Sequence, residues 1–161
     1  MVIKTLNNEF SVSPQIQPAD IQSLRDQGFR AVICNRLDGE GADQPDFEAI
    51  EAAAKAAGMS ASYVPVVAGK VGDDDVQHFD AALKALPRPV LAYCRTGTRS
   101  ATLWSLSQAD KMSVPEILAA TRAADIDMSG VVRRIANGGK TPTDVGDASF
   151  DVVIVGGGAA G

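Results

Sequence analysis

The segment Pro89-Val90-Leu91-Ala92-Tyr93-Cys94-Arg95-Thr96-Gly97-Thr98-Arg99-Ser100 decides the fold that we expect. Its first residues form an apolar run that predicts a buried strand, and a short turn with a glycine follows. The apolar-periodic residues 100–106 then predict a helix. This order places Cys94 below backbone N–H groups at a helix N-terminus, with Arg99 folded back over the same hollow. Such a hollow binds anions and favours the thiolate form of a cysteine.

The rest of the chain alternates strand signals with helix signals. Strands are predicted at 10–13, 30–35 and 63–67, and helices at 18–28, 45–58, 75–86, 100–111, from 114 onward and near 131–136. This alternation predicts a three-layer α/β fold with a mainly parallel central sheet and helices on both faces. In such sheets, catalytic groups lie at the carboxyl ends of the strands, where Cys94 is expected.

The sequence divides into three parts. Residues 1–137 have the length and patterning of one domain with a real core. Residues 138–149 are rich in Gly, Pro, Thr and Asp without periodicity, which predicts a linker. Residues 150–161 are interpreted below as the truncated start of a dinucleotide-binding domain.

Composition narrows the functional class. The net charge is −5, and no cluster of Lys and Arg suggests a surface that follows nucleic-acid phosphates. No signal-peptide core and no segment long enough to span a membrane are found in the sequence. Two cysteines do not make a disulfide framework in a chain of 161 residues. We therefore expect a cytoplasmic enzyme without a metal, a nucleic-acid partner or a membrane partner.

The cysteine loop has the residue types that anion chemistry requires. Cys94 supplies a nucleophile, and Gly97 allows the turn without a steric penalty. Arg99 can hold a tetrahedral oxyanion with paired donors. Ser100 or Thr98 can donate a hydroxyl hydrogen bond to the Cys94 sulfur. The simpler alternative is a cysteine that ends a core strand, beside solvated arginines and a capping serine.

Several other residues are candidates for the same site. In the loop, the amides around Thr96 to Arg99 bind the anion, and Arg95 attracts anionic substrates. Arg36, Asp38 and Glu40 follow the carboxyl end of a parallel strand and could line the pocket, although a surface ion-pair cluster is the alternative. Asp74, within the run 73–75, is a candidate acid, but helix capping is the preferred interpretation.

Two further residues are assigned to structural roles. Cys34 ends a β-branched strand and is interpreted as core packing, with a resolving thiol as the alternative. His78 is the only histidine. It lies in a predicted helix and is interpreted as packed or solvent-facing rather than catalytic.

The cysteine loop resembles those of two enzyme families. It is similar to the loop of rhodanese-type sulfurtransferases, in which cysteine carries a persulfide. It also resembles the phosphate loop of cysteine-dependent tyrosine and dual-specificity phosphatases, whose pattern is His-Cys-x5-Arg. Here Tyr93 precedes the cysteine and Arg99 follows in a Cys-x4-Arg spacing, as in the tighter sulfurtransferase loop.

The region from Phe10 to about Trp104 resembles the phosphatase-like domain named after β-lactamase-hydrolase-like proteins. The stretches that carry this resemblance are Asn35-Arg36-Leu37-Asp38-Gly39-Glu40 with Asp43-Gln44-Pro45, and Ala92 through Ser100. The resemblance implies a fold like that of cysteine-dependent phosphatases. It also implies sulfur transfer as a chemistry of the family, since the family is catalogued with sulfur transferases.

The last residues resemble the first strand and glycine turn of a flavoprotein of the pyridine-nucleotide-disulfide or sulfide:quinone type. Gly156, Gly158 and Gly161 follow the apolar run Asp151-Val152-Val153-Ile154-Val155. The helix and the ribose-binding acid of that motif are missing. We therefore expect no cofactor in this fragment, FAD only in a full-length fusion, and the missing flavoprotein domain as a partner.

Three functions are compatible with these residues. The leading hypothesis is sulfur transfer through a Cys94 persulfide, from a small anionic sulfane-sulfur donor to a thiol acceptor. The alternative is hydrolysis of a phosphomonoester through a Cys94-phosphate intermediate. The third is a non-catalytic module that senses sulfide or oxidants for the flavoprotein.

Overall fold

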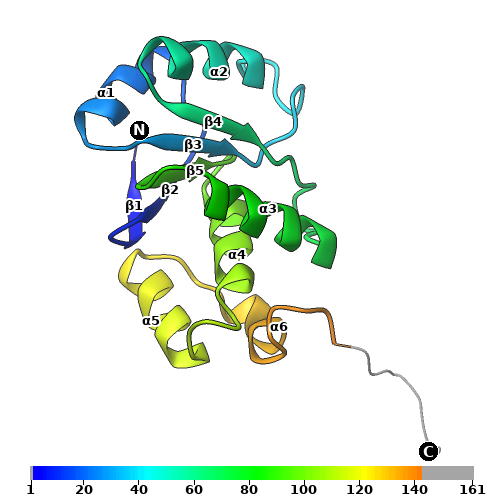
Figure 1. Cartoon of the computed structure of the whole chain (residues 1–161). Helices are drawn as coiled ribbons and strands as arrows, with labels where there is room; N and C mark the ends of the chain where they lie inside the picture. Colours follow the sequence, from blue (N-terminus) through cyan, green and yellow to red (C-terminus); the bar gives the residue numbers. More distant parts are fainter. Residues whose placement is uncertain (1, 143–161) are drawn as a thin grey trace, which may run out of the picture.

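The computed structural model describes residues 2–142 and forms an α/β domain (Figure 1). The strands are β1 (Lys4–Asn7), β2 (Phe10–Ser13), β3 (Ala31–Cys34), β4 (Ser60–Tyr63) and β5 (Val90–Tyr93). The helices are α1 (Ile21–Asp26), α2 (Phe47–Ala56), α3 (Asp73–Ala85), α4 (Thr98–Ser107), α5 (Val114–Ala123) and α6 (Val132–Ala136). Two 3₁₀ turns, Pro18–Asp20 and Ser129–Val131, precede α1 and α6.

The five strands form one sheet in the order β1-β2-β5-β3-β4. The strands β2, β5, β3 and β4 are parallel, and only β1 at the edge is antiparallel. β5, which leads to Cys94, therefore lies in the middle of the sheet between β2 and β3. This arrangement confirms the predicted mainly parallel sheet.

Alternation along the strands assigns the two faces of the sheet. Leu91 and Tyr93 of β5 pack with α1 and α2 in one cluster of buried residues. Val90 and Ala92 point to the other face and pack with residues of α3, α4, α5 and α6. Figure 1 shows the same division, with α1 and α2 on one side of the sheet and the remaining helices on the other. The predicted three layers are therefore confirmed.

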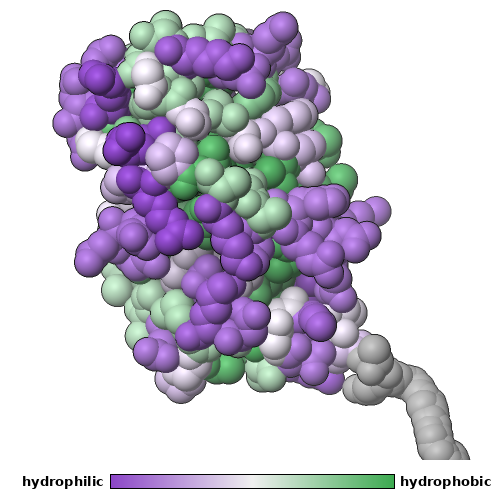
Figure 2. Space-filling model, in the orientation of Figure 1, coloured by the Kyte–Doolittle hydropathy of each residue, from purple (hydrophilic) through white to green (hydrophobic). Residues whose placement is uncertain are grey.

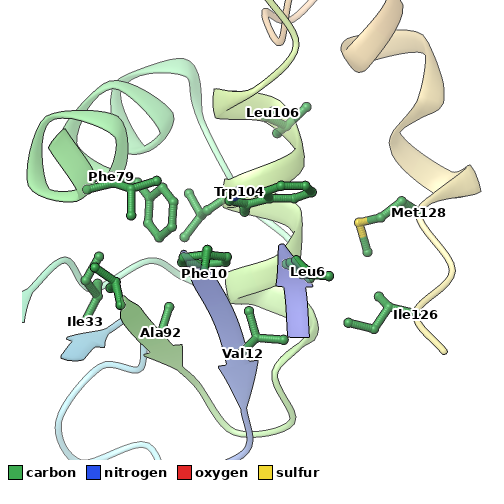
Figure 3. Packing of buried hydrophobic residues seen from close by; sticks show 14 of the residues in the cluster. Leu6, Phe10, Val12, Ile33, Phe79, Ala92, Trp104, Leu106, Ile126 and Met128 are labelled. Carbon is green, nitrogen blue, oxygen red and sulfur yellow. The ribbon is translucent and has the colours of Figure 1, made fainter. Parts of the chain in front are cut away.

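The larger cluster centres on three aromatic side chains (Figure 3). The rings of Phe10 and Trp104 are stacked with centroids 6.0 Å apart. Phe79 meets Phe10 edge-on at 5.9 Å. These contacts join β2, α3 and α4, and so fix the helix that follows the cysteine loop against the sheet.

Two strands differ from the sequence prediction. β1 has no counterpart among the predicted strands, and β4 covers Ser60–Tyr63 rather than 63–67. Pro65 has no N–H, so it ends regular pairing after Tyr63. The N–H groups of Val64 and Val66 still bond to the carbonyl groups of Cys34 and Asn35. The segment therefore runs beside β3 past the end of the strand.

Local hydrogen bonds by capping side chains determine where α3 and α5 begin. The sequence leaves the cap of α3 open among Asp73, Asp74 and Asp75. The helix begins at Asp73, and the Asp75 carboxylate caps it by accepting the N–H of Gly72 at 2.8 Å. α5 begins after Ser113, whose hydroxyl accepts the N–H of Glu116 at 3.2 Å. α4 ends at Ser107 instead of Lys111. Residues 108–112 are a hydrogen-bonded turn.

The first residues of the predicted linker contact the domain. Gly139 is buried, and the backbone N–H and hydroxyl of Thr141 both donate to Asp73, at 2.9 and 2.8 Å. Residues 143–149 of that linker and the segment 150–161 lie outside the described residues. The domain boundaries therefore stay a prediction.

The surface carries few large apolar side chains. Among the described residues, those that are exposed are Val2, Tyr63 and Val67. Figure 2 shows a face on which hydrophilic side chains prevail and apolar patches lie between them. No helix within residues 2–142 has the length and hydrophobicity that a membrane span requires. A cytoplasmic location stays a prediction.

Candidate active site

The cysteine loop joins β5 to α4 through a left-handed glycine. Gly97 has φ +95°, a conformation that other residues adopt only with strain. A Cβ at this position would lie 3.4 Å from the carbonyl of Ser13 at the end of β2. Both the backbone angle and the close approach of β2 therefore favour glycine here.

This turn points a backbone donor at the thiol. The N–H of Gly97 lies 3.0 Å from the Cys94 sulfur. Cys94 is 1% exposed, yet it lines a cavity of about 780 Å³. Cys94 thus borders a cavity despite its low exposure and stays the candidate nucleophile.

The predicted hydroxyl hydrogen bond to sulfur is wrong for Ser100. Its Oγ donates its one proton to Asn35 Oδ1 at 2.8 Å. Thr98 instead accepts a hydrogen bond from the Thr96 hydroxyl at 3.3 Å. Asn35 follows β3 on the sheet face that also carries α4, which brings its amide to the buried Ser100. Ser100 thus ties α4 to β3.

Arg99 is buried and makes four contacts with its terminal nitrogens. Nη1 donates to the carbonyl groups of Asn35 (3.0 Å) and Val66 (2.8 Å), and to Glu40 Oε2 (2.8 Å). Nη2 donates to Glu40 Oε1 at 3.1 Å. Its Nε is buried without a hydrogen-bond partner among the described residues. Arg99 also lines the Cys94 cavity, so its guanidinium contributes positive charge to it.

Glu40 holds Arg99 in place. Its carboxylate also accepts the Leu37 N–H at 3.2 Å and the Arg36 Nε at 3.4 Å. The hydrogen bond from Arg99 is the main reason why the pKa of Glu40 is lowered. The carboxylate therefore stays ionised and cannot readily release a proton.

The cavity is strongly cationic. Its charged lining consists of four arginines, the thiol and one carboxylate: Arg36, Arg95, Arg99, Arg134, Cys94 and Glu40. The loop residues Thr96 and Thr98 line it as well. A surplus of guanidinium groups around a sulfur suits an anionic substrate.

The structure brings most predicted site residues together, but not two carboxylates. Asp38 accepts the N–H of Phe47 at 2.8 Å, at the start of α2, and does not line the cavity. Asp74 is exposed in the first turn of α3 and lines another cavity, with Asp80 and Lys140. Asp74 lies there because α3 starts at Asp73, which makes residue 74 part of the helix rather than of a loop.

Sequence reasoning missed three residues of the site. Asn35 and Val66 bind Arg99 through their carbonyl groups, and Arg134 comes from α6. Backbone acceptors leave no trace in the sequence. Arg134 lies 40 positions after Cys94, and no local motif connects the two.

Cys34 lies on the opposite face of the sheet from the site. It packs in the same cluster as Tyr93, and its thiol donates to the Arg36 carbonyl at 3.2 Å. Burial raises the pKa of Cys34, so this thiol stays protonated. These features match the packing role predicted for Cys34. His78 is exposed on α3, as predicted.

Comparison with known proteins places this geometry in a family. The sequence profile of the "Beta-lactamase hydrolase-like protein, phosphatase-like domain" matches residues 2–111. The chain belongs to this family. The resemblance of the region from Phe10 to about Trp104 to this phosphatase-like domain is thereby confirmed.

Individual relatives and solved structures agree with this family and this fold. A Beta-lactamase hydrolase-like protein of Xylella fastidiosa is 31% identical over 82% of this chain, which spans 31% of that relative's length. A crystal structure from Neisseria meningitidis is described as a candidate phosphatase and is 36% identical in sequence. Its TM-score to this protein is 0.76, and the match covers 86% of this chain and 99% of that chain. The structure of a cysteine-to-serine variant of P. aeruginosa TpbA in complex with pTyr is 14% identical in sequence, with a TM-score of 0.60. The match covers 88% of this chain and 84% of that chain, and it shows a shared fold.

These findings support a phosphatase-like, cysteine-based fold. Nothing in the comparisons shows sulfur transfer or a flavoprotein segment. Gly156, Gly158 and Gly161 lie outside the described residues, so the fusion with a flavoprotein and its FAD stay predictions. Within residues 2–142, no group of three or more His, Cys, Asp or Glu side chains could hold a metal ion.

The pair of Glu40 with Arg99 yields a first prediction. The variant Glu40→Gln leaves a buried guanidinium without its counter-charge, and we expect a loss of about 1–3 kcal/mol in the free energy of unfolding at pH 7. The lowered pKa of Glu40 means that its contribution is present above the unfolded value and disappears as pH falls through the folded value. The difference between the two proteins in urea unfolding should therefore shrink in acid.

The matched control is Glu9→Gln, which breaks an exposed pair with Arg88. We expect a loss of less than about 1 kcal/mol there. Equal losses at pH 7 for the two variants would show that Glu40 does not stabilise the site.

A second prediction concerns Gly97. The variant Gly97→Ala should lose about 1 kcal/mol of stability through strain at positive φ. It should also alkylate more slowly at Cys94, because the displaced backbone N–H no longer stabilises the thiolate. Peptide mass mapping after iodoacetamide treatment measures this rate separately for each cysteine.

Gly28→Ala serves as the control, since Gly28 has φ +101° with open space around its Cα. It should share the loss of stability but keep the alkylation rate of Cys94. An unchanged rate in Gly97→Ala would contradict the role of this N–H.

Proposed function

We propose that this protein hydrolyses phosphomonoesters through a Cys94-phosphate intermediate. One observation carries the proposal: the Cys94 sulfur accepts the Gly97 N–H at the edge of a cavity that four arginines line. Membership of a phosphatase-like family supports it. The fold shared with TpbA, whose structure contains pTyr, is consistent with it.

The first step forms a bond between sulfur and phosphorus. The Cys94 thiolate attacks phosphorus while the ester P–O bond breaks, and the electron pair of that bond goes to the leaving oxygen. In this scheme, the Arg99 guanidinium and the loop amides stabilise the charge that develops on the phosphoryl oxygens. Arg99 is preorganised for this by Glu40 and two carbonyl groups, so little reorganisation is needed.

The second step restores the enzyme. Water attacks phosphorus, the S–P bond breaks, and its electron pair returns to the sulfur. The proton lost by water balances the proton that the leaving alcohol takes up. The sum is one ester and one water converted to one alcohol and one phosphate.

The described cavity offers little help to the leaving group. Its one carboxylate among residues 2–142 is Glu40, which Arg99 holds in the ionised form. Asp38 and Asp74 do not line it. Solvent must then supply the proton to the leaving oxygen, and substrates with acidic leaving groups should react best.

Sulfur transfer is the second candidate, because Arg99 follows Cys94 in a Cys-x4-Arg spacing that suits a smaller group. The thiolate would attack the outer sulfur of a donor such as thiosulfate, and sulfite would leave with the electron pair of the broken S–S bond. An acceptor thiolate would then take the sulfur from the Cys94 persulfide and restore Cys94. A non-catalytic sensing role is the alternative if neither substrate class is turned over.

The variant Cys94→Ser tests the proposal. Hydrolysis of p-nitrophenyl phosphate should fall by at least about 10³-fold, because serine is a far weaker nucleophile here. Mass spectrometry of an acid-quenched reaction should detect phosphate on Cys94 in the wild-type protein alone. The control Cys34→Ala, which changes the buried thiol on the other face, should keep the activity.

Turnover of p-nitrophenyl phosphate that is unaffected by Cys94→Ser would overturn the proposal. A wild-type protein that forms a Cys94 persulfide from thiosulfate, and releases no phosphate from any ester, would favour the second candidate.

The leaving group provides a further prediction. The wild-type kcat/KM for p-nitrophenyl phosphate should exceed that for phenyl phosphate by about 100-fold or more, the contribution typical of a general acid that this cavity lacks. Steady-state kinetics of substituted phenyl phosphates measures this dependence. Equal rates across the series would show that a residue does protonate the leaving oxygen.

A further inference from the structure

Arg134 reaches the reaction cavity from outside the region that matches the family. The family profile ends at residue 111, whereas Arg134 and Val131 belong to the following helical segment. Both line the cavity that contains Cys94. One wall of the cavity is therefore built by α6 and the turn before it.

Two hydrogen bonds fix the guanidinium of Arg134. Nη1 donates to the Val71 carbonyl at 2.6 Å, and Nη2 donates to Asp73 Oδ1 at 3.2 Å. Asp73 is itself fixed by the N–H of Thr141, which is the main cause of its lowered pKa. The Nε of Arg134 is buried without a hydrogen-bond partner among the described residues. Nη1 and Nη2 each carry a second N–H beyond these two bonds, so Arg134 has a fixed position and further donors.

The other three arginines of the cavity have different positions and roles. Arg99 belongs to the cysteine loop and serves the reacting phosphoryl group. Arg36 is tied to Glu40 and to Gln15, whose Oε1 lies 3.1 Å from its Nη1. Arg95 is exposed beside Cys94. Arg134 is the one that comes from a separate helix.

Size also distinguishes this cavity from a site for one phosphate. Its volume of about 780 Å³ falls in the range of pockets that enclose whole small molecules. A phosphoryl group on Cys94 fills only the inner end. The remaining space is bounded by Val71, Val131 and the cation of Arg134.

We propose that Arg134 binds a second phosphate group of the substrate, so that the preferred substrate is a small molecule with two phosphate groups. This inference rests on the proposed phosphatase function and names its substrate class. Arg134 is a specificity-determining residue in this scheme. It contributes to binding of the second group and leaves the attack by Cys94 unchanged.

The wild-type protein provides the first test. Competitive inhibition of p-nitrophenyl phosphate hydrolysis is measured with inorganic phosphate, methylenebisphosphonate and propane-1,3-bisphosphonate. We expect at least one bisphosphonate to bind about 10-fold more tightly than phosphate, as one additional charge-assisted contact allows. The two spacings report how far the second group lies from the first. Equal inhibition constants for all three compounds would overturn the proposal.

Variants assign the effect to Arg134. Arg134→Gln should lose the preference for a bisphosphonate, so that its inhibition constants for phosphate and for the bisphosphonates become nearly equal, whatever its kcat for p-nitrophenyl phosphate. Arg134→Lys, which keeps the charge, should retain part of the preference. The control Arg133→Gln removes the same charge from the neighbouring exposed position, which does not line the cavity. A preference that survives in Arg134→Gln, or is lost equally in Arg133→Gln, would contradict the assignment.

Binding without turnover separates this inference from the proposed function. Calorimetry with Cys94→Ser measures the affinity for phosphate and for each bisphosphonate directly. If no ester is hydrolysed but Cys94→Ser binds a bisphosphonate more tightly through Arg134, the phosphatase function fails and the second anion site stands. If esters are hydrolysed and the three affinities are equal, the function stands and this inference fails.

Discussion

The buried guanidinium of Arg99 is the interaction on which the site depends. It connects four separate segments: the first turn of α4, the Asn35 carbonyl after β3, the Val66 carbonyl after β4, and Glu40 in the loop before α2. A buried charge without partners costs several kcal/mol, so each of these acceptors is needed. The cation that we propose as the substrate-binding group also holds the carboxyl end of the sheet together.

This arrangement places a cysteine at the end of a central strand beside a cavity while leaving it almost unexposed. The parallel order of β2, β5 and β3 brings the ends of three strands to one edge. Ser13 of β2 approaches Gly97 closely, and Asn35 after β3 binds both Arg99 and Ser100. The loop is thus supported from both sides, and its N–H groups keep their direction toward the sulfur when an anion enters.

The layers, the parallel sheet and the position of Cys94 are predictable from the sequence alone, because they follow from local periodicity and from the order of strand, turn and helix. Contacts between segments that are distant in the sequence cannot be predicted in this way. The sequence offers the hydroxyl of Ser100 or Thr98 to the sulfur, yet the Ser100 proton goes to Asn35, 65 positions away. The role of Asp38 could not be separated from that of Glu40, since both follow β3 and only the folded loop decides which carboxylate meets Arg99.

Arg134 shows why the reaction and its specificity have different sources in this chain. The residues that we propose to attack and stabilise a phosphoryl group lie between positions 35 and 100, within the region that matches the family. The far wall of the cavity comes from a segment that starts after that region, and packing of α6 against α4 aligns it. Because α4 carries Arg99 at its start and also contacts α6, the positions of Arg99 and Arg134 both depend on α4. A change in α6 could therefore alter which anions fit without moving the nucleophile.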